Sequence, residues 1–180
     1  MLTDAQLITR ASGGDRTAFE LLYERHWSAV YNYSWLLARS VPDAEDITQE
    51  CFLALIRKPA AFDPARAQLR TWLIAVARRQ YLGRSRRSAR ETTGDSHEPA
   101  LAAGFDEKLI LVERAEAVRI AVAVLPEAQR EALYLFEFEG LSMAEIAEML
   151  DIEVNAVKAR LHRAREHLKR LLAPLTKGTL

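Results

Sequence analysis

The sequence predicts an all-α protein made of two small helical domains joined by a flexible linker. Apolar residues recur at spacings of three and four along most of the chain, and no segment shows the alternation typical of a β-strand. One polar stretch rich in helix breakers, residues 91–99, interrupts this periodicity. We therefore predict domains at residues 1–88 and 105–180, with a linker at residues 89–104.

The first two predicted helices are separated by Gly13–Gly14. A short helix begins near Thr3, and Asp15 can cap the longer helix that follows, because its side chain can accept a bond from a free amide of the first turn. The aromatic residues of the second helix follow a helical spacing, so we expect them in the core. These aromatic residues are Tyr23, Trp27, Tyr31 and Trp35.

The third predicted helix begins around Pro42, whose ring suits a first turn, and ends before Pro59. Acidic residues crowd its start, where the helix dipole favours negative charge. Ile47, Cys51 and Leu55 follow one stripe and are expected to point inward. A loop leads to a fourth helix, which begins near Leu69 and whose Trp72 is expected to pack in the core.

Helical periodicity resumes at Phe105, beyond the linker. Pro126 is expected in the first turn of a helix that ends at Gly140. The apolar residues of that helix are expected to supply its core. These residues are Leu133, Leu135, Phe136 and Phe138.

A helix-turn-helix is the sharpest local pattern in the chain. Ser142 and Glu145 are spaced as a capping box, and Asp151 can adopt the left-handed conformation of a tight turn. The second helix, starting near Asn155, has an apolar stripe expected to pack on its own domain: Val157, Leu161, Ala164, Leu168 and Leu171. An outward stripe carries the hydrogen-bonding and cationic groups that a major-groove reading helix needs: Asn155, Lys158, Ala159, His162 and Arg163.

Charge is balanced overall but segregated along the chain. There are 25 basic and 25 acidic residues, yet arginines crowd residues 78–90 and further cations crowd residues 158–170. Such segregation is typical of a neutral protein that binds nucleic acid. No apolar run approaches the length needed to insert into a membrane, and no signal-peptide pattern is present, so we expect a cytoplasmic protein.

The residues offer no support for an enzyme. There is no metalloprotease motif, phosphate loop or nucleophile elbow, and the four histidines form no ligand set with the lone Cys51. We expect no catalytic residues, no metal site and no cofactor.

Three segments together resemble the extracytoplasmic-function (ECF) sigma factors of bacterial RNA polymerase, in the sigma-70 superfamily. "DAEDITQECFLALIR" and "FDPARAQLRTWLIAVARRQYLGRSRR" resemble region two of that family. "LPEAQREALYLFEFEGLSMAEIAEMLDIEVNAVKARLHRAREHLKRLL" resembles region four. The resemblance spans nearly the whole chain, and the two regions occur in the family's order.

The resemblance implies a division of labour between the domains. Region two is expected to bind the clamp helices of the largest polymerase subunit and to help melt the minus-ten element, while region four reads the minus-thirty-five element as duplex and meets the flap of the second-largest subunit. Polymerase would supply all the chemistry. The resemblance also implies an anti-sigma factor as an inhibitory partner.

The implied site residues fall on three surfaces. The polymerase-docking positions, which also form an acidic face by spacing, are Asp43, Asp46, Gln49 and Glu50. The expected minus-ten contacts are arginines of the fourth predicted helix and of the loop before it: Arg66, Arg70, Arg78, Arg79, Arg84, Arg86 and Arg87. The family's minus-thirty-five reading positions fall on Lys158, Ala159, His162 and Arg163, within the outward stripe of the second helix of the helix-turn-helix.

Two positions depart from the family pattern, which often has Asn where this chain has Arg79 and usually has Gly-Thr where it has Asn155–Ala156. An alternative function is also open, that of a helix-turn-helix transcriptional regulator that does not confer initiation on core polymerase. That alternative explains the helix-turn-helix but not the acidic third helix followed by an arginine-rich fourth.

Overall fold

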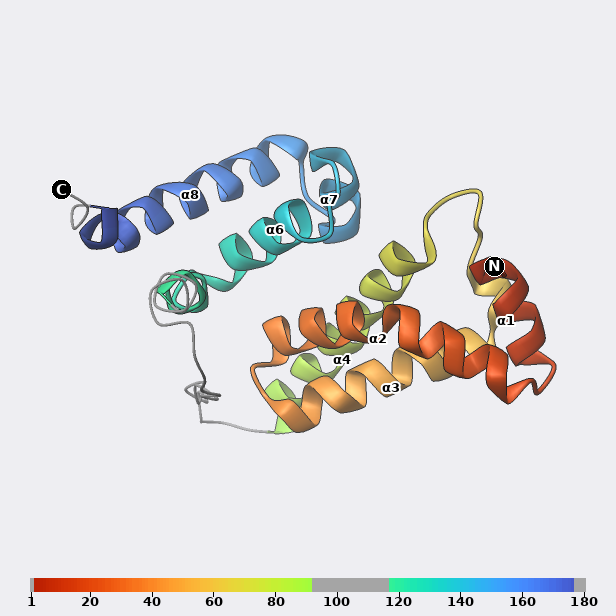
Figure 1. The fold of residues 1–180 in the computed structure, drawn as a ribbon. Helices are drawn as coiled ribbons and strands as arrows, with labels where there is room; N and C mark the ends of the chain where they lie inside the picture. The colour runs from red at the N-terminus through yellow and green to blue at the C-terminus, as the bar shows by residue number, and fades with distance from the viewer. Residues whose placement is uncertain (1, 92–116, 177–180) are drawn as a thin grey trace. The chain divides into compact units, whose positions relative to one another are not determined.

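The computed structural model describes residues 2–91 and 117–176, which lie in two units, Met1–Ala100 and Leu101–Leu180 (Figure 1). Within the described ranges every regular element is helical, which confirms the predicted all-α class. Most of the predicted linker, and the periodicity that resumes at Phe105, lie outside the described residues.

The first unit contains four α-helices and one short 3₁₀ helix. Their bounds are α1 Asp4–Ser12, α2 Arg16–Ala38, α3 Val41–Arg57, η1 Pro59–Ala61 and α4 Leu69–Glu91. α2 packs against α1, α3 and α4, and α3 also contacts α1 and α4. α4 continues to Glu91, three residues into the stretch predicted as linker from residue 89.

The helix starts of this unit follow from capping residues. Thr3 forms a capping box with Gln6, the Asp15 side chain accepts from the Ala18 amide, and the Ser40 side chain accepts from the Asp43 amide. These oxygens satisfy amides that have no partner within the helix. The predicted starts of the first three helices are therefore confirmed to within a residue or two.

A set of aliphatic side chains with no exposed surface forms the core of this unit: Leu7, Leu22, Ile47, Leu55, Leu73 and Ile74. Cys51 lies among them, fully buried, as predicted. Burial raises the pKa of its thiol to about 12, because the thiolate would be charged in an apolar surrounding. Cys51 therefore acts as a small apolar core residue.

The expectation that four aromatic residues of α2 lie in the core is wrong. Trp27 is 37% exposed, and Tyr23, Tyr31 and Trp35 are only half-buried. Tyr23, Trp27 and Tyr31 follow one another at i,i+4 along the side of α2, and the rings of Trp27 and Tyr31 stack with centroids 4.8 Å apart. The helical spacing was correct, but the face that α1, α3 and α4 cover is the neighbouring one, where Tyr33 is fully buried.

Trp72 packs against the loop that precedes α4. Its indole Nε1 donates a hydrogen bond to the Ala61 carbonyl at 3.1 Å, and its ring meets the Phe62 ring edge-on at 5.9 Å. Asp63 tightens the same loop by accepting from the Ala65 amide at 2.9 Å. The predicted packing role of Trp72 is confirmed. Its contacts lie with the loop before α4 and not at the centre of the core.

The second unit is described from residue 117 onward. A helical stretch at residues 117–123 precedes α6 Glu127–Glu137, α7 Met143–Leu150 and α8 Val154–Thr176. α8 contacts both α6 and α7. Arg130 of α6 is buried and donates to the Ala123 and Leu125 carbonyls, at 3.1 and 2.9 Å, which fastens the connection before α6.

Two apolar residues of this unit are less buried than predicted. Phe138 is 65% exposed because it stands at the C-terminal end of α6, where its ring stacks on Tyr134 with centroids 5.3 Å apart. Leu171 is 47% exposed because it lies near the end of α8, beyond the buried residues Val157, Leu161 and Ala164. Both expectations of full core packing were therefore wrong. Across the described ranges, no helix is long and apolar enough to cross a membrane.

Candidate functional site

The predicted docking residues lie on the outer side of α3. Asp43, Asp46 and Gln49 are exposed and Glu50 is half-buried, whereas Ile47 in the same helix has no exposed surface. This difference follows from the helical period, which turns alternate stripes inward and outward. The outer stripe, called here the acidic face of α3, is available to a basic partner.

One predicted DNA-binding arginine lies against the acidic face of α3. The Arg84 guanidinium is 3.2 Å from an Asp46 carboxylate oxygen and 3.8 Å from one of Asp43. All three side chains keep a third or more of their surface exposed, so this pair contributes only about 0–1 kcal/mol to stability. The two predicted surfaces therefore meet at Arg84 instead of being fully separate.

The other predicted minus-ten residues are spread over the loop and α4. Arg66 and Arg70 are exposed near the start of α4, and Arg79, Arg86 and Arg87 are exposed further along it. Arg78 is half-buried. These cations are thus presented along one helix and its preceding loop, which suits contact with a phosphate backbone.

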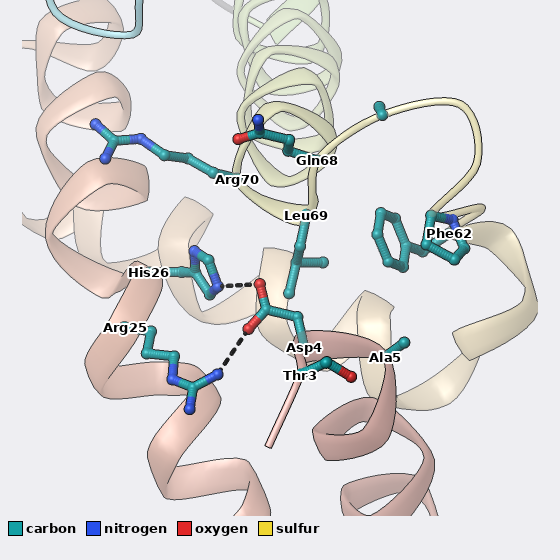
Figure 2. A pocket seen from close by; sticks show the side chains of 11 residues that line it. Thr3, Asp4, Ala5, Arg25, His26, Phe62, Gln68, Leu69 and Arg70 are labelled. Carbon is teal, nitrogen blue, oxygen red and sulfur yellow. Dashed lines mark hydrogen bonds and ion pairs between the residues drawn. The ribbon is translucent and has the colours of Figure 1, made fainter. Parts of the chain in front are cut away.

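A hollow of about 430 Å³ lies where this loop, α1 and α2 meet (Figure 2). Phe62, Leu69 and Arg70 line it on the loop side, and Arg25 and His26 line it from α2. The sequence predicted Arg70 as a DNA contact near this hollow, but it did not predict the residues of α1 and α2 that line it. No local pattern could reveal them, because Asp4 and His26 are 22 positions apart in the chain and meet only through helix packing.

The helix-turn-helix forms as predicted. Ser142 and Glu145 make both bonds of the capping box: the Ser142 amide donates to the Glu145 carboxylate at 2.8 Å, and the Glu145 amide donates to the Ser142 hydroxyl at 3.2 Å. Hydrogen bonds from the Ser142 side chain and then its backbone lower the pKa of Glu145, because they stabilise the carboxylate. Asp151 has φ of 56°, the left-handed conformation expected for this turn.

The predicted reading positions lie on the outer side of α8. Asn155, Lys158, His162 and Arg163 are exposed and Ala159 is half-buried, while Val157, Leu161 and Ala164 are buried beneath them. Arg165, on an adjoining stripe, forms an ion pair with Glu137 at 2.9 Å and covers the Phe136 ring. Arg165 therefore braces α8 against α6, and the predicted reading residues remain available to DNA.

Comparisons with known proteins bear on both units. The family model of Sigma-70 region 2 matches residues 22–91, and that of Sigma-70, region 4 matches residues 115–168. The chain is 33% identical over 176 residues to the ECF RNA polymerase sigma factor SigM of Mycobacterium tuberculosis (strain H37Rv), covering 98% of this chain and 88% of the relative. The chain belongs to the family of ECF RNA polymerase sigma factors.

Other sigma factors agree over a similar length. The ECF sigma-E factor of Escherichia coli (strain K12) is 33% identical, with 97% of this chain and 96% of the relative covered. Among solved structures, CnrH in complex with the cytosolic domain of CnrY is 28% identical with a TM-score of 0.62, covering 95% of this chain and 97% of that one. The sigma factor RpoE of Bartonella quintana, solved with the anti-sigma factor NepR, has a TM-score of 0.71 at 24% identity, covering 86% and 96%.

The predicted family and the general function of a sigma factor in transcription initiation are thereby confirmed. The alternative of a regulator outside the sigma family is not supported, since both regions match in one chain.

Proposed function

We propose that this sigma factor docks on core RNA polymerase through the acidic face of α3 and reads the promoter through two other surfaces. The clamp helices of the largest subunit are the partner of Asp43, Asp46, Gln49 and Glu50. One observation supports this assignment most directly: these residues form the outer stripe of a helix whose inner stripe is fully buried.

The minus-ten element is proposed to bind as melted strand along α4 and the loop before it. Arg66, Arg70, Arg79, Arg86 and Arg87 provide exposed cations for its phosphates. Melting loses stacking energy of about 1.4 kcal/mol per step, so the protein must hold the released bases. The hollow beside Phe62 provides a concave, solvent-open place for one of them.

The minus-thirty-five element is proposed to be read as duplex by α8. Lys158, His162 and Arg163 reach outward from a helix whose back is packed on its own unit, as major-groove reading requires. A good bidentate contact to a base edge contributes about 1–3 kcal/mol of discrimination. The flap of the second-largest polymerase subunit is the proposed protein partner of this unit.

In this proposal the chain carries out no chemistry, and it acts in the cytoplasm, where polymerase meets promoter DNA. An anti-sigma factor is proposed as its inhibitor. The complex of the similar protein CnrH with a cytosolic domain of CnrY supports the idea that a sigma factor of this form binds a further protein.

Two double variants test the division of roles. Asp46→Lys with Glu50→Lys reverses charge on the acidic face of α3 and should abolish binding to core polymerase. Lys158→Ala with Arg163→Ala should leave core binding intact and impair run-off transcription from promoters that depend on the minus-thirty-five element. Equal loss of core binding in both double variants would show that docking and reading are not separated.

A further inference from the structure

Arg84 lies at the boundary between two of the surfaces proposed above. It belongs to α4, but its Nη1 lies 3.2 Å from an Asp46 carboxylate oxygen and 3.8 Å from one of Asp43, both on α3. Arg87, three positions further along α4, is exposed. Because residues three apart are neighbours on a helix surface, Arg84 stands between the acidic face of α3 and a cation proposed to bind the melted strand.

This ion pair occupies groups that docking needs. A cation beside a carboxylate reduces the negative charge that attracts a basic partner, and it presents a like charge to that partner. Glu50, the third carboxylate of the acidic face of α3, has Arg57 at 3.9 Å, but both of these residues belong to α3. Arg84 differs from Arg57 because it brings a cation of the proposed strand-binding helix onto the docking surface.

The Arg84 guanidinium can leave the two carboxylates at little cost. Its side chain is 36% exposed, and those of Asp43 and Asp46 are 57% and 63% exposed, so water can solvate all three groups when they separate. An arginine side chain also has many rotamers, so the guanidinium can turn while α4 stays in place. A phosphate group then offers it a charged, bidentate partner in exchange.

We propose that Arg84 couples polymerase docking to strand binding. In the free chain it neutralises Asp46 and Asp43. On docking, the basic partner binds these carboxylates in its place, and Arg84 turns to a phosphate of the melted strand. This inference rests on the proposed docking and melting functions. Because the exchange links two binding events, each event strengthens the other by the same factor.

The first measurement is the affinity of the full chain for core polymerase without DNA, by fluorescence anisotropy. Arg84→Gln removes the cation and keeps a long polar side chain, so it should bind core polymerase about three- to fivefold more tightly, the range of one exposed ion pair. Arg16→Gln is the matched control, because Arg16 is an exposed cation of the same unit that pairs with Glu20 of α2 at 3.0 Å. Its effect on core affinity should be less than about twofold.

The second measurement is the affinity of the assembled holoenzyme for a single-stranded minus-ten oligonucleotide over a range of salt concentrations. Arg84→Gln should lower this affinity about fivefold at roughly 0.1 M salt, and should reduce the slope of log affinity against log salt by about 0.7, the loss of one phosphate contact. Arg84→Lys keeps a cation and should resemble the unaltered chain in both measurements. Tighter docking with weaker strand binding is the expected signature, because a merely structural role of Arg84 would weaken both.

A third variant tests whether Arg84 acts on docking through the acids of α3. In a chain that already carries Asp43→Asn and Asp46→Asn, adding Arg84→Gln should no longer tighten binding to core polymerase, because the carboxylates that Arg84 neutralises are gone. A gain that persists in this chain would show that Arg84 acts by another route. Thermal unfolding verifies that every variant folds.

Further results would separate failure of this inference from failure of the proposed function. If Arg84→Gln changes core affinity no more than Arg16→Gln, or lowers it, Arg84 does not compete with the polymerase. If docking tightens but strand affinity and its salt slope are unchanged, the guanidinium does not pass to the strand and the coupling is wrong. If Asp46→Lys with Glu50→Lys leaves core binding intact, the proposed docking function itself fails, and an unaltered holoenzyme that binds the oligonucleotide no better than core polymerase would overturn the melting role.

Discussion

At the scale of single residues, environment decides what each side chain does. Cys51 and Asp46 are five positions apart on α3. Cys51 is fully buried, whereas Asp46 is exposed and forms an ion pair with Arg84. The Cys51 thiol packs as an apolar group because water is excluded from its surroundings. The carboxylate is available to partners because it lies on the opposite side of the same helix.

Cys51 should be unreactive in the folded protein. Because burial raises the pKa of its thiol from 9.0 to about 12, the reactive thiolate is scarce at neutral pH, and the site is closed to reagents. We expect negligible alkylation by iodoacetamide in buffer and complete alkylation in urea, measured by mass spectrometry. The buried, protonated thiol of Cys51 contributes to the folding stability below pH 9.0, and this contribution is lost as pH rises toward about 12. Rapid labelling of the native protein would contradict this burial.

At the scale of elements, helix ends are set by short polar contacts. Thr3, Asp15, Ser40 and Ser142 each cap a helix within two residues of its predicted start. Asp151, with positive φ, turns the chain between α7 and α8. The reading helix α8 is therefore placed by local bonds on its N-terminal side and by the buried stripe beneath it.

Ser142→Ala should weaken the helix-turn-helix by about 1 kcal/mol, the usual loss at an N-cap. The Ser142 hydrogen bonds are what lower the Glu145 pKa, so the variant should raise that pKa toward its ordinary value of 4.5. In the unaltered protein the stabilisation is present above pH 4.5 and is lost as pH falls through the lowered pKa of Glu145. NMR titration of the Glu145 carboxyl and thermal unfolding measure the two effects.

Ser142→Thr is the matched control, because it keeps a hydroxyl at the cap and should preserve both the pKa and the stability. A Glu145 pKa unchanged in Ser142→Ala would mean that the capping box does not form in solution.

At the scale of the whole molecule, the chain is organised as two units that each bury their own apolar residues. Leu22, Ile47 and Leu73 form part of one core, and Leu135, Ile146 and Val157 form part of the other. Because the buried residues named for each core come from one unit, the docking and duplex-reading functions proposed here can be assigned to separate pieces of chain.

Residues 1–100 alone should bind core polymerase, and residues 101–180 alone should bind minus-thirty-five duplex, because each piece keeps its core and its proposed surface. Circular dichroism verifies that each piece is helical, and fluorescence anisotropy measures its binding. Asp46→Lys with Glu50→Lys in residues 1–100 is the negative control. A folded first piece without affinity for core polymerase would count against docking through α3.

The acidic face of α3 and the helix-turn-helix could be predicted from sequence because both depend on local patterns. A helical period separates Asp46 from Ile47, and capping and turn residues at fixed offsets define α7 and α8. Family resemblance added the expected partners of these surfaces. The all-α class followed from the same periodicity.

Features that depend on which helix faces are covered could not be predicted from spacing alone. Spacing shows that Tyr23, Trp27 and Tyr31 share a side of α2, but only the packing of the neighbouring helices leaves that side partly exposed. The Arg84–Asp46 pair and the Asp4–Arg25–His26 cluster likewise join positions distant in the chain. The helices and their stripes follow from the order of the residues, whereas the pairing of stripes is set by tertiary packing, because side-chain contacts between helices depend on their arrangement in space.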